Sequence, residues 1–120
     1  MKKLIMIVDD DENLRKSVKL VLEKNGYNVL EAVSRGDALR KIKLKKPDLI
    51  LLDILMYGPS SSGEFAYKLG SSKKYSSIKI IYISAVEDVK ISHTGRNVCG
   101  AIEKPFKNKE LIDMVKKALK

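Results

Sequence analysis

Several apolar runs of the sequence end in residues that can do chemistry. Carboxylates follow two of these runs, Asp9 and Asp10 after "LIMIV" and Asp53 after "LILL". The run "IIYI" leads to Ser84, and the run "CGAI" leads through Glu103 to Lys104. In a strand that is buried on both faces, an unpaired carboxylate would cost several kcal/mol. Asp53 therefore needs either an exit to solvent or a partner.

These side chains are the parts that a phosphoryl-transfer site requires. Three carboxylates held close together call for a cation, and an oxygen-only ligand set without histidine or cysteine favours a hard ion such as Mg²⁺. A carboxylate can attack phosphorus and form an aspartyl phosphate. A lysine and a hydroxyl can then bind the phosphoryl oxygens while the cation neutralises the developing charge.

Strand-like and helix-like segments alternate along the chain and predict how these residues are positioned. We expect strands at residues 3–8, 27–32, 49–53, 78–85 and 98–106, and helices at 12–26, 34–46, 63–72 and 108–120, the last with Asn108 as its N-cap. This alternation indicates an α/β fold with a doubly wound parallel sheet covered by helices on both faces. Ligands of such sheets bind beyond the carboxyl ends of the strands, where the polar residues above are found.

Length and composition restrict the class of protein. The 120 residues suit one domain, and the formal net charge of +9 comes with only four arginines among 24 basic residues. Lysines are spread over every predicted helix without interleaved aromatic residues, which argues for a solvated basic surface and against direct nucleic-acid binding. No segment approaches membrane-spanning length. The single cysteine, Cys99, suits a reducing compartment, so we expect a cytoplasmic protein with Cys99 as a small core residue.

Four motifs, in this order and near the usual spacing, resemble the receiver domain of two-component response regulators: "IVDDDENLR", "PDLILLDILM", "IIYISA" and "EKPF". The resemblance covers essentially the whole chain, residues 1–120. It implies a flavodoxin-like strand order 2-1-3-4-5. It also implies that Asp53 accepts a phosphoryl group from a phosphohistidine on a sensor histidine kinase or phosphotransfer protein.

The same resemblance implies a role for each polar residue. Mg²⁺ would be bound by Asp9, Asp10, Asp53 and the backbone carbonyl of Leu55. Ser84 would bond the phosphoryl group and draw its loop inward, and Lys104 would pair with Asp53 or its phosphate. The Lys104–Pro105 peptide would be cis. The protein would catalyse its own phosphorylation without being a turnover enzyme, and a downstream protein would read the phosphorylated state by contact.

The chain also departs from the receiver pattern. Tyr57 stands where receivers commonly have proline, and Gly63 falls about two residues later than usual. Ala101 replaces the usual aromatic switch residue. The segment "DVKISHTGRN" has β-branched residues and a glycine where a fourth helix belongs, so we expect that helix to be short or irregular. An order change of residues 86–98 would then carry the signal.

Two enzyme classes use similar residues, but each requires a side chain that this chain lacks. "GPSSSGEF" begins like a P-loop, but Glu64 and Phe65 stand where lysine and serine or threonine must bind phosphate and Mg²⁺. A phosphatase resembling the haloacid dehalogenase family would carry a second acid two residues after its nucleophile, where this chain has Leu55. A binding module that works without phosphorylation stays open. Asp11 is expected only to cap the first helix.

Overall fold

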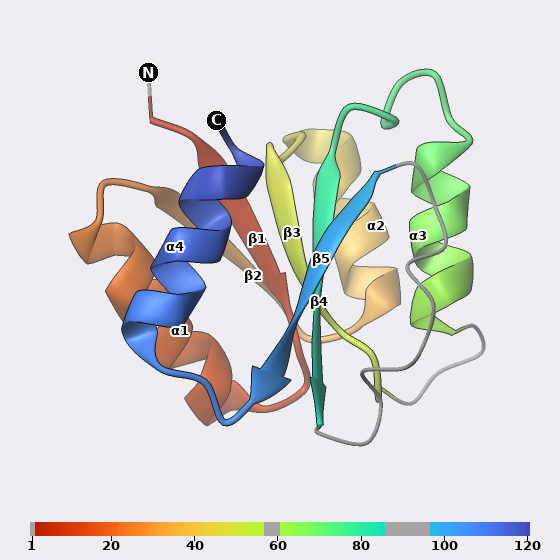
Figure 1. Ribbon diagram of the computed structural model, residues 1–120. Helices are drawn as coiled ribbons and strands as arrows, with labels where there is room; N and C mark the ends of the chain where they lie inside the picture. Colours follow the sequence, from red (N-terminus) through yellow and green to blue (C-terminus); the bar gives the residue numbers. More distant parts are fainter. Residues whose placement is uncertain (1, 57–60, 86–96) are drawn as a thin grey trace.

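A five-stranded parallel sheet lies between two pairs of helices in the computed structural model, which describes residues 2–56, 61–85 and 97–120 (Figure 1). The strands are β1 (Leu4–Val8), β2 (Asn28–Ala32), β3 (Leu49–Asp53), β4 (Lys79–Ala85) and β5 (Val98–Lys104). The helices are α1 (Glu12–Lys24), α2 (Arg35–Leu44), α3 (Ser62–Gly70) and α4 (Asn108–Ala118). The strand order is β2-β1-β3-β4-β5 with every pair parallel, which confirms the α/β fold and the order that the resemblance implies.

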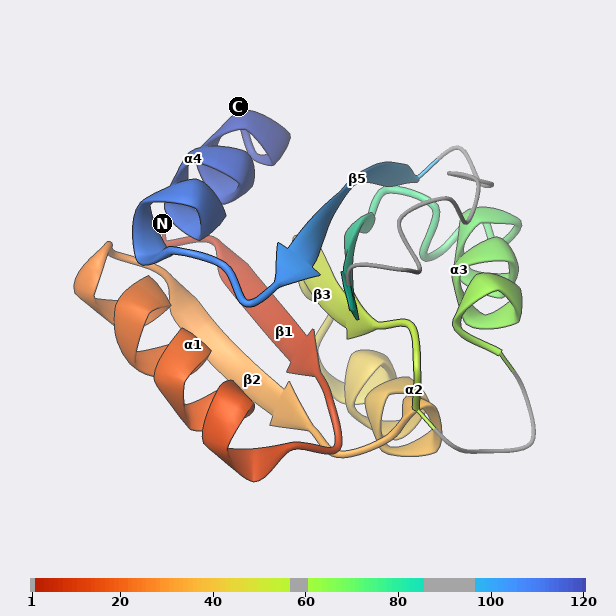
Figure 2. The ribbon, with the colours of Figure 1, turned by 60° about the horizontal axis from the view of Figure 1, so that its bottom comes forward.

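The two faces of the sheet carry two separate apolar cores. Helices α1 and α4 cover one face and α2 and α3 cover the other, as Figures 1 and 2 show. Successive side chains of a strand point to opposite faces. In β1, Ile5 and Ile7 join the core under α1 and α4, and Met6 and Val8 join the core under α2 and α3. All five residues of β1 and of β3 are buried, so the apolar sequence of β1 and of β3 up to Leu52 follows from their position in the middle of the sheet.

Side-chain caps begin three of the four helices that the described residues form. The carboxylate of Asp11 accepts hydrogen bonds from the N–H groups of Asn13 and Leu14, as predicted for this residue. Ser34 and Ser61 cap α2 and α3 in the same way.

The prediction that Asn108 caps the last helix is wrong. The N–H of Leu111 donates to the carbonyl of Lys107, so Lys107 is the cap residue and Asn108 is the first residue inside α4. The lysine side chain has no acceptor atom, and no other side chain in the described ranges caps this helix.

Cys99 is exposed, so the expectation that it lies in the core is wrong. It belongs to β5, an edge strand that pairs only with β4, and its neighbours Val98 and Gly100 are only half-buried. Its thiol donates to the carbonyl of Ile80 at 3.5 Å. The position of this strand at the edge of the sheet could not be inferred from its short apolar sequence.

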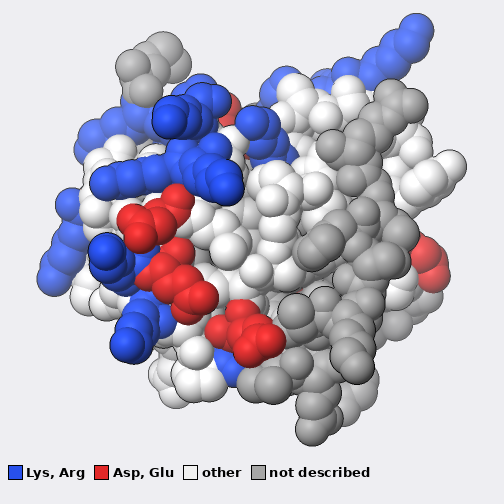
Figure 3. Space-filling view, in the orientation of Figure 1, with Lys and Arg blue, Asp and Glu red and all other residues white. Residues whose placement is uncertain are grey.

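Residues 86–96, for which the sequence predicts a short or irregular helix, lie outside the described residues, as does Tyr57. In the ranges that are described, no helix is long and apolar enough to cross a bilayer. Figure 3 shows basic side chains gathered at the end of the molecule where both termini lie, with acidic side chains beside them. The carboxyl ends of the strands point toward the opposite end (Figure 1).

Truncation of one buried side chain in the central strand, β3, tests the packing of the core. We expect Leu51→Ala to lower the free energy of unfolding by about 2–5 kcal/mol, because Leu51 is fully buried and the change leaves a cavity. Leu44→Ala, at a side chain that is 80% exposed, should change it by less than about 0.5 kcal/mol. Urea unfolding would measure both, and equal effects of the two substitutions would contradict the account.

Candidate functional site

The polar residues predicted from the sequence meet at one edge of the sheet. Strands β1, β3, β4 and β5 are neighbours in that order, so their carboxyl ends bring Asp9, Asp53, Ser84 and Lys104 together. The register is explicit: Asp53 lies opposite Ile83 on β4, one residue before Ser84, and Lys104 lies opposite Ala85.

Three carboxylates form a compact cluster at this edge. Asp9, Asp10 and Asp53 each offer an oxygen, and these oxygens all lie within 4.8 Å of one another. Asp9 is fully buried, Asp53 is 5% exposed, and Asp10 faces solvent. Like charges held this close repel one another unless a cation or a proton intervenes. A donor set made only of oxygens can hold a hard metal ion, so these residues fit the site that the sequence predicts.

Lys104 supplies a positive charge to the two buried carboxylates. Its Nζ lies 3.2 Å from Asp9 Oδ2 and 3.7 Å from Asp53 Oδ1, so it bridges both acids and lies closer to Asp9. The Lys104–Pro105 peptide that follows is cis, as the resemblance implies.

Burial and the neighbouring charges both act on the carboxyl of Asp9. Burial raises the pKa of the Asp9 carboxyl, and the nearby charge of Asp53 raises it further. The backbone N–H of Asp11, which donates to Asp9 Oδ1 at 2.9 Å, and the Lys104 ammonium act in the opposite direction.

The other two predicted residues lie beside the carboxylates. Ser84 is fully buried, and its hydroxyl has no hydrogen-bond partner among the described residues. An unsatisfied buried hydroxyl costs about 1–3 kcal/mol, so an acceptor entering the site would be favoured there. Leu55 lies in the turn that follows β3, with its side chain 59% exposed.

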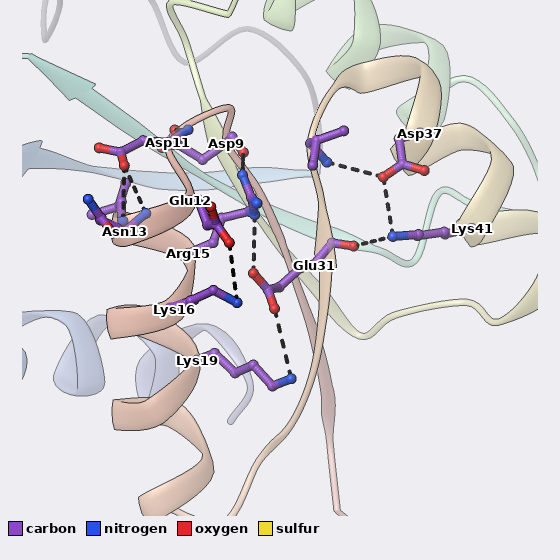
Figure 4. Close-up of polar contacts among 12 residues, drawn as sticks. Asp9, Asp11, Glu12, Asn13, Arg15, Lys16, Lys19, Glu31, Asp37 and Lys41 are labelled. Carbon is purple, nitrogen blue, oxygen red and sulfur yellow. Dashed lines mark hydrogen bonds and ion pairs between the residues drawn. The ribbon is translucent and has the colours of Figure 1, made fainter.

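Sequence reasoning missed the residues that hold the strand ends in place. Arg15 of α1 is buried, and its Nη1 donates to the backbone carbonyl of Asp9 at 2.7 Å while its Nε donates to Glu31 at 3.1 Å (Figure 4). Arg35 and Ser62 hold the end of β3 in a comparable way. The available signal was weak, because an arginine next to a predicted apolar stripe is usually a surface residue.

Neutralising Asp9 should stabilise the metal-free protein. We expect Asp9→Asn to raise the free energy of unfolding near neutral pH by about 1 kcal/mol, since the amide removes a buried negative charge. The pKa of Asp9 in the folded state lies above its ordinary value of 3.8, so the folded wild type gains stability as the pH falls through that raised pKa toward 3.8. The difference between variant and wild type should therefore shrink over that interval.

Urea unfolding at several pH values with a metal chelator would measure this difference. Asp10→Asn is the matched control, because Asp10 is exposed and its neutralisation should change stability by less than about 0.5 kcal/mol. A lower stability of Asp9→Asn at neutral pH would show that the Lys104 pairing outweighs the burial of Asp9.

Comparison with known proteins gives a consistent result. Residues 5–116 match the response regulator receiver domain. The chain is 38% identical over 121 residues to the phosphate regulon transcriptional regulatory protein PhoB of Pseudomonas aeruginosa, covering 98% of this chain and 52% of that protein. It is 31% identical over 121 residues to the alkaline phosphatase synthesis transcriptional regulatory protein PhoP of Bacillus subtilis, covering 100% of this chain and 50% of that protein. The chain thus spans about half the length of the curated relatives it matches.

Solved structures agree with the sequence relatives. A putative response regulator from Chloroflexus aurantiacus superposes with a TM-score of 0.90 at 27% identity, covering 99% of this chain and 98% of that one. The chemotaxis response regulator CheY4 of Vibrio cholerae shares the fold, with a TM-score of 0.88 at 23% identity, covering 99% of this chain and 100% of that one. The chain belongs to the receiver domains of two-component response regulators, a family of phosphorylation-dependent switches.

Proposed function

We propose that Asp53 accepts a phosphoryl group from a phosphohistidine of a sensor histidine kinase or phosphotransfer protein, with Mg²⁺ at the carboxylate cluster. The observation that supports this most strongly is the position of a buried carboxylate, Asp53, within 4.8 Å of two further acids and 3.7 Å from a lysine ammonium. Asp9, Asp10, Asp53 and the carbonyl of Leu55 would hold the ion.

The Asp53 carboxylate is arranged for attack on phosphorus. Its Oδ1 accepts the N–H of Leu55 at 3.1 Å, whereas Oδ2 has no hydrogen bond among the described residues and would be the attacking oxygen. A bond from this oxygen to phosphorus forms as the phosphorus–nitrogen bond of the donor breaks, and the electron pair leaves with the imidazole. Mg²⁺, when bound, supplies neutralisation of the charge on the transferring group.

Two further side chains would bind the transferred group. Lys104 already lies between Asp9 and Asp53, so a small movement would bring its ammonium to a phosphoryl oxygen. The hydroxyl of Ser84, which has no partner among the described residues, would donate to another oxygen, which would satisfy a buried polar group and draw the end of β4 toward the phosphate.

The proposal includes a mode of action. Residues 1–120 form one receiver domain that catalyses its own phosphorylation, also from small phosphodonors, works in the cytoplasm and does not turn over a substrate. A downstream protein reads the phosphorylated state by contact. The matched relatives are transcriptional regulatory proteins of which this chain covers about half, so we assign no DNA contact to the chain itself.

Labelling with acetyl phosphate tests the proposal. The protein should gain one phosphoryl group in the presence of Mg²⁺ and none with a chelator, as measured by intact mass. Asp53→Asn should abolish the gain, and Asp10→Ala should lower its rate about tenfold or more. Asp113→Asn, an exposed acid on α4, should label like the wild type. Unchanged labelling of Asp53→Asn would contradict the assignment of Asp53 as the phosphoryl acceptor. Steady release of phosphate from a phosphate ester would favour a phosphatase.

The lifetime of the phosphate should depend on Leu55. Hydrolysis of an aspartyl phosphate needs a water aligned opposite the leaving carboxylate, and a receiver residue two positions after the acceptor flanks that approach. Leu55 is exposed there and cannot orient water, so we expect slow hydrolysis of the phosphate in the wild type. Leu55→Asn should raise the hydrolysis rate about tenfold. Leu55→Met should decay like the wild type. Phosphate release after removal of the donor measures the hydrolysis rates of all three proteins. Equal rates in the wild type and Leu55→Asn would show that the side chain at position 55 does not govern hydrolysis.

A further inference from the structure

Arg35 is a buried cation for which the proposed reaction has no use. It is the first residue of α2, is 6% exposed, and forms no ion pair with a carboxylate of the described residues. Its Nη1 donates to the carbonyl of Met56 at 3.1 Å and to the hydroxyl of Ser62 at 3.3 Å. Burying a guanidinium without a carboxylate partner costs free energy, so the groups that it binds indicate its role.

Ser62 connects this guanidinium to the proposed acceptor residue. It is the first residue of α3 and is 2% exposed. Its hydroxyl accepts from Arg35 and donates to the backbone carbonyl of Asp53 at 2.7 Å. The carbonyl of Ile54 lies 3.4 Å from the same hydroxyl. We call Arg35 and Ser62 the β3 clamp, because together they tie the first turns of α2 and α3 to the end of β3.

The β3 clamp holds the turn that contains Leu55 from both sides. It binds the carbonyls of Asp53 and Met56, which precede and follow Leu55 in the chain. The N–H of Leu55 donates to the Asp53 carboxylate, and the N–H of Ile54 donates to the carbonyl of Ile83 on β4. The carbonyl of Leu55 itself accepts no hydrogen bond from the described residues, which leaves it available to a ligand.

We propose that Arg35 and Ser62 are positioning residues for the cation: by holding the Asp53–Met56 turn they place the carbonyl of Leu55 and raise the affinity of the carboxylate cluster for Mg²⁺. This inference rests on the proposed Mg²⁺ site. Mg²⁺ demands near-ideal octahedral geometry with short metal–oxygen distances, so a ligand that is displaced by a fraction of an ångström lowers affinity. Outer groups that orient metal ligands typically change affinity by about 10- to 100-fold when they are removed.

Titration calorimetry of Mg²⁺ into the metal-free protein tests the β3 clamp directly. Arg35→Met and Ser62→Ala should each raise the dissociation constant about tenfold. The double variant should be little weaker than either single one, because both residues act through one chain of hydrogen bonds. Arg40→Met is the matched control on the same helix, and its dissociation constant should equal that of the wild type, since the Arg40 side chain is 67% exposed.

A second readout separates positioning from general stability. Labelling by acetyl phosphate should need about tenfold more Mg²⁺ in the clamp variants, yet should reach the wild-type rate within about twofold once Mg²⁺ is saturating. Should Arg35→Met fail to fold, the smaller change Ser62→Ala decides the matter.

The outcomes distinguish this inference from the function on which it rests. A dissociation constant within twofold of the wild type in Ser62→Ala would overturn the β3 clamp and leave the proposed function intact. A lower labelling rate of the clamp variants at saturating Mg²⁺, with the wild-type dependence on Mg²⁺ concentration, would also overturn the β3 clamp and leave the proposed function intact. Failure of the wild type itself to bind Mg²⁺ would overturn both proposals.

Discussion

The burial of two carboxylates beside a single ammonium is the constraint on which this structure depends. Asp9 and Asp53 are almost completely inaccessible, and Lys104 is shared between them. Two buried negative charges and one half-buried positive charge leave an excess that water cannot screen well. The edge of the sheet therefore favours an additional cation, and it holds Asp53, the carboxylate that we propose as the nucleophile, in a place where a phosphoryl group bound to that cation would be stabilised.

The order of the strands creates this constraint. Because β1 and β3 are adjacent, Asp9 and Asp53 are neighbours although they lie 44 positions apart in the chain. The two apolar cores fix the rotation of each strand, since a shift by one residue would move every buried side chain to the other face. Arg15 on one side and the β3 clamp on the other then hold the backbone of the two strand ends. The apolar packing and the polar site thus depend on the same register.

Much of this arrangement could be predicted from local patterns. Continuous apolar runs indicate buried parallel strands, and the acids at the ends of "LIMIV" and "LILL" mark the edge where ligands bind. The strand order itself is not encoded in any local pattern and came from the resemblance to receivers. The details that failed depend on tertiary context: Cys99 is exposed because β5 is an edge strand, and the last helix begins without a side-chain cap.

The clamp residues show why part of the site lies beyond sequence reasoning. Arg35 and Ser62 are 27 residues apart in the chain, and they come into contact only because α2 and α3 pack on the same face of the sheet. In the sequence, each is a polar residue at the point where a loop ends and a helix begins. Only the buried contacts reveal that they bind the carbonyls around Leu55.

A crystal structure of the protein with Mg²⁺ and beryllofluoride, a mimic of the phosphoryl group, would test the central claim most directly. We expect the beryllofluoride on an Asp53 carboxylate oxygen, with Lys104 Nζ and Ser84 Oγ within hydrogen-bond distance of its fluorines, and Mg²⁺ among Asp9, Asp10, Asp53 and the Leu55 carbonyl. Beryllofluoride on a different carboxylate, or Mg²⁺ bound away from the three aspartates, would contradict it.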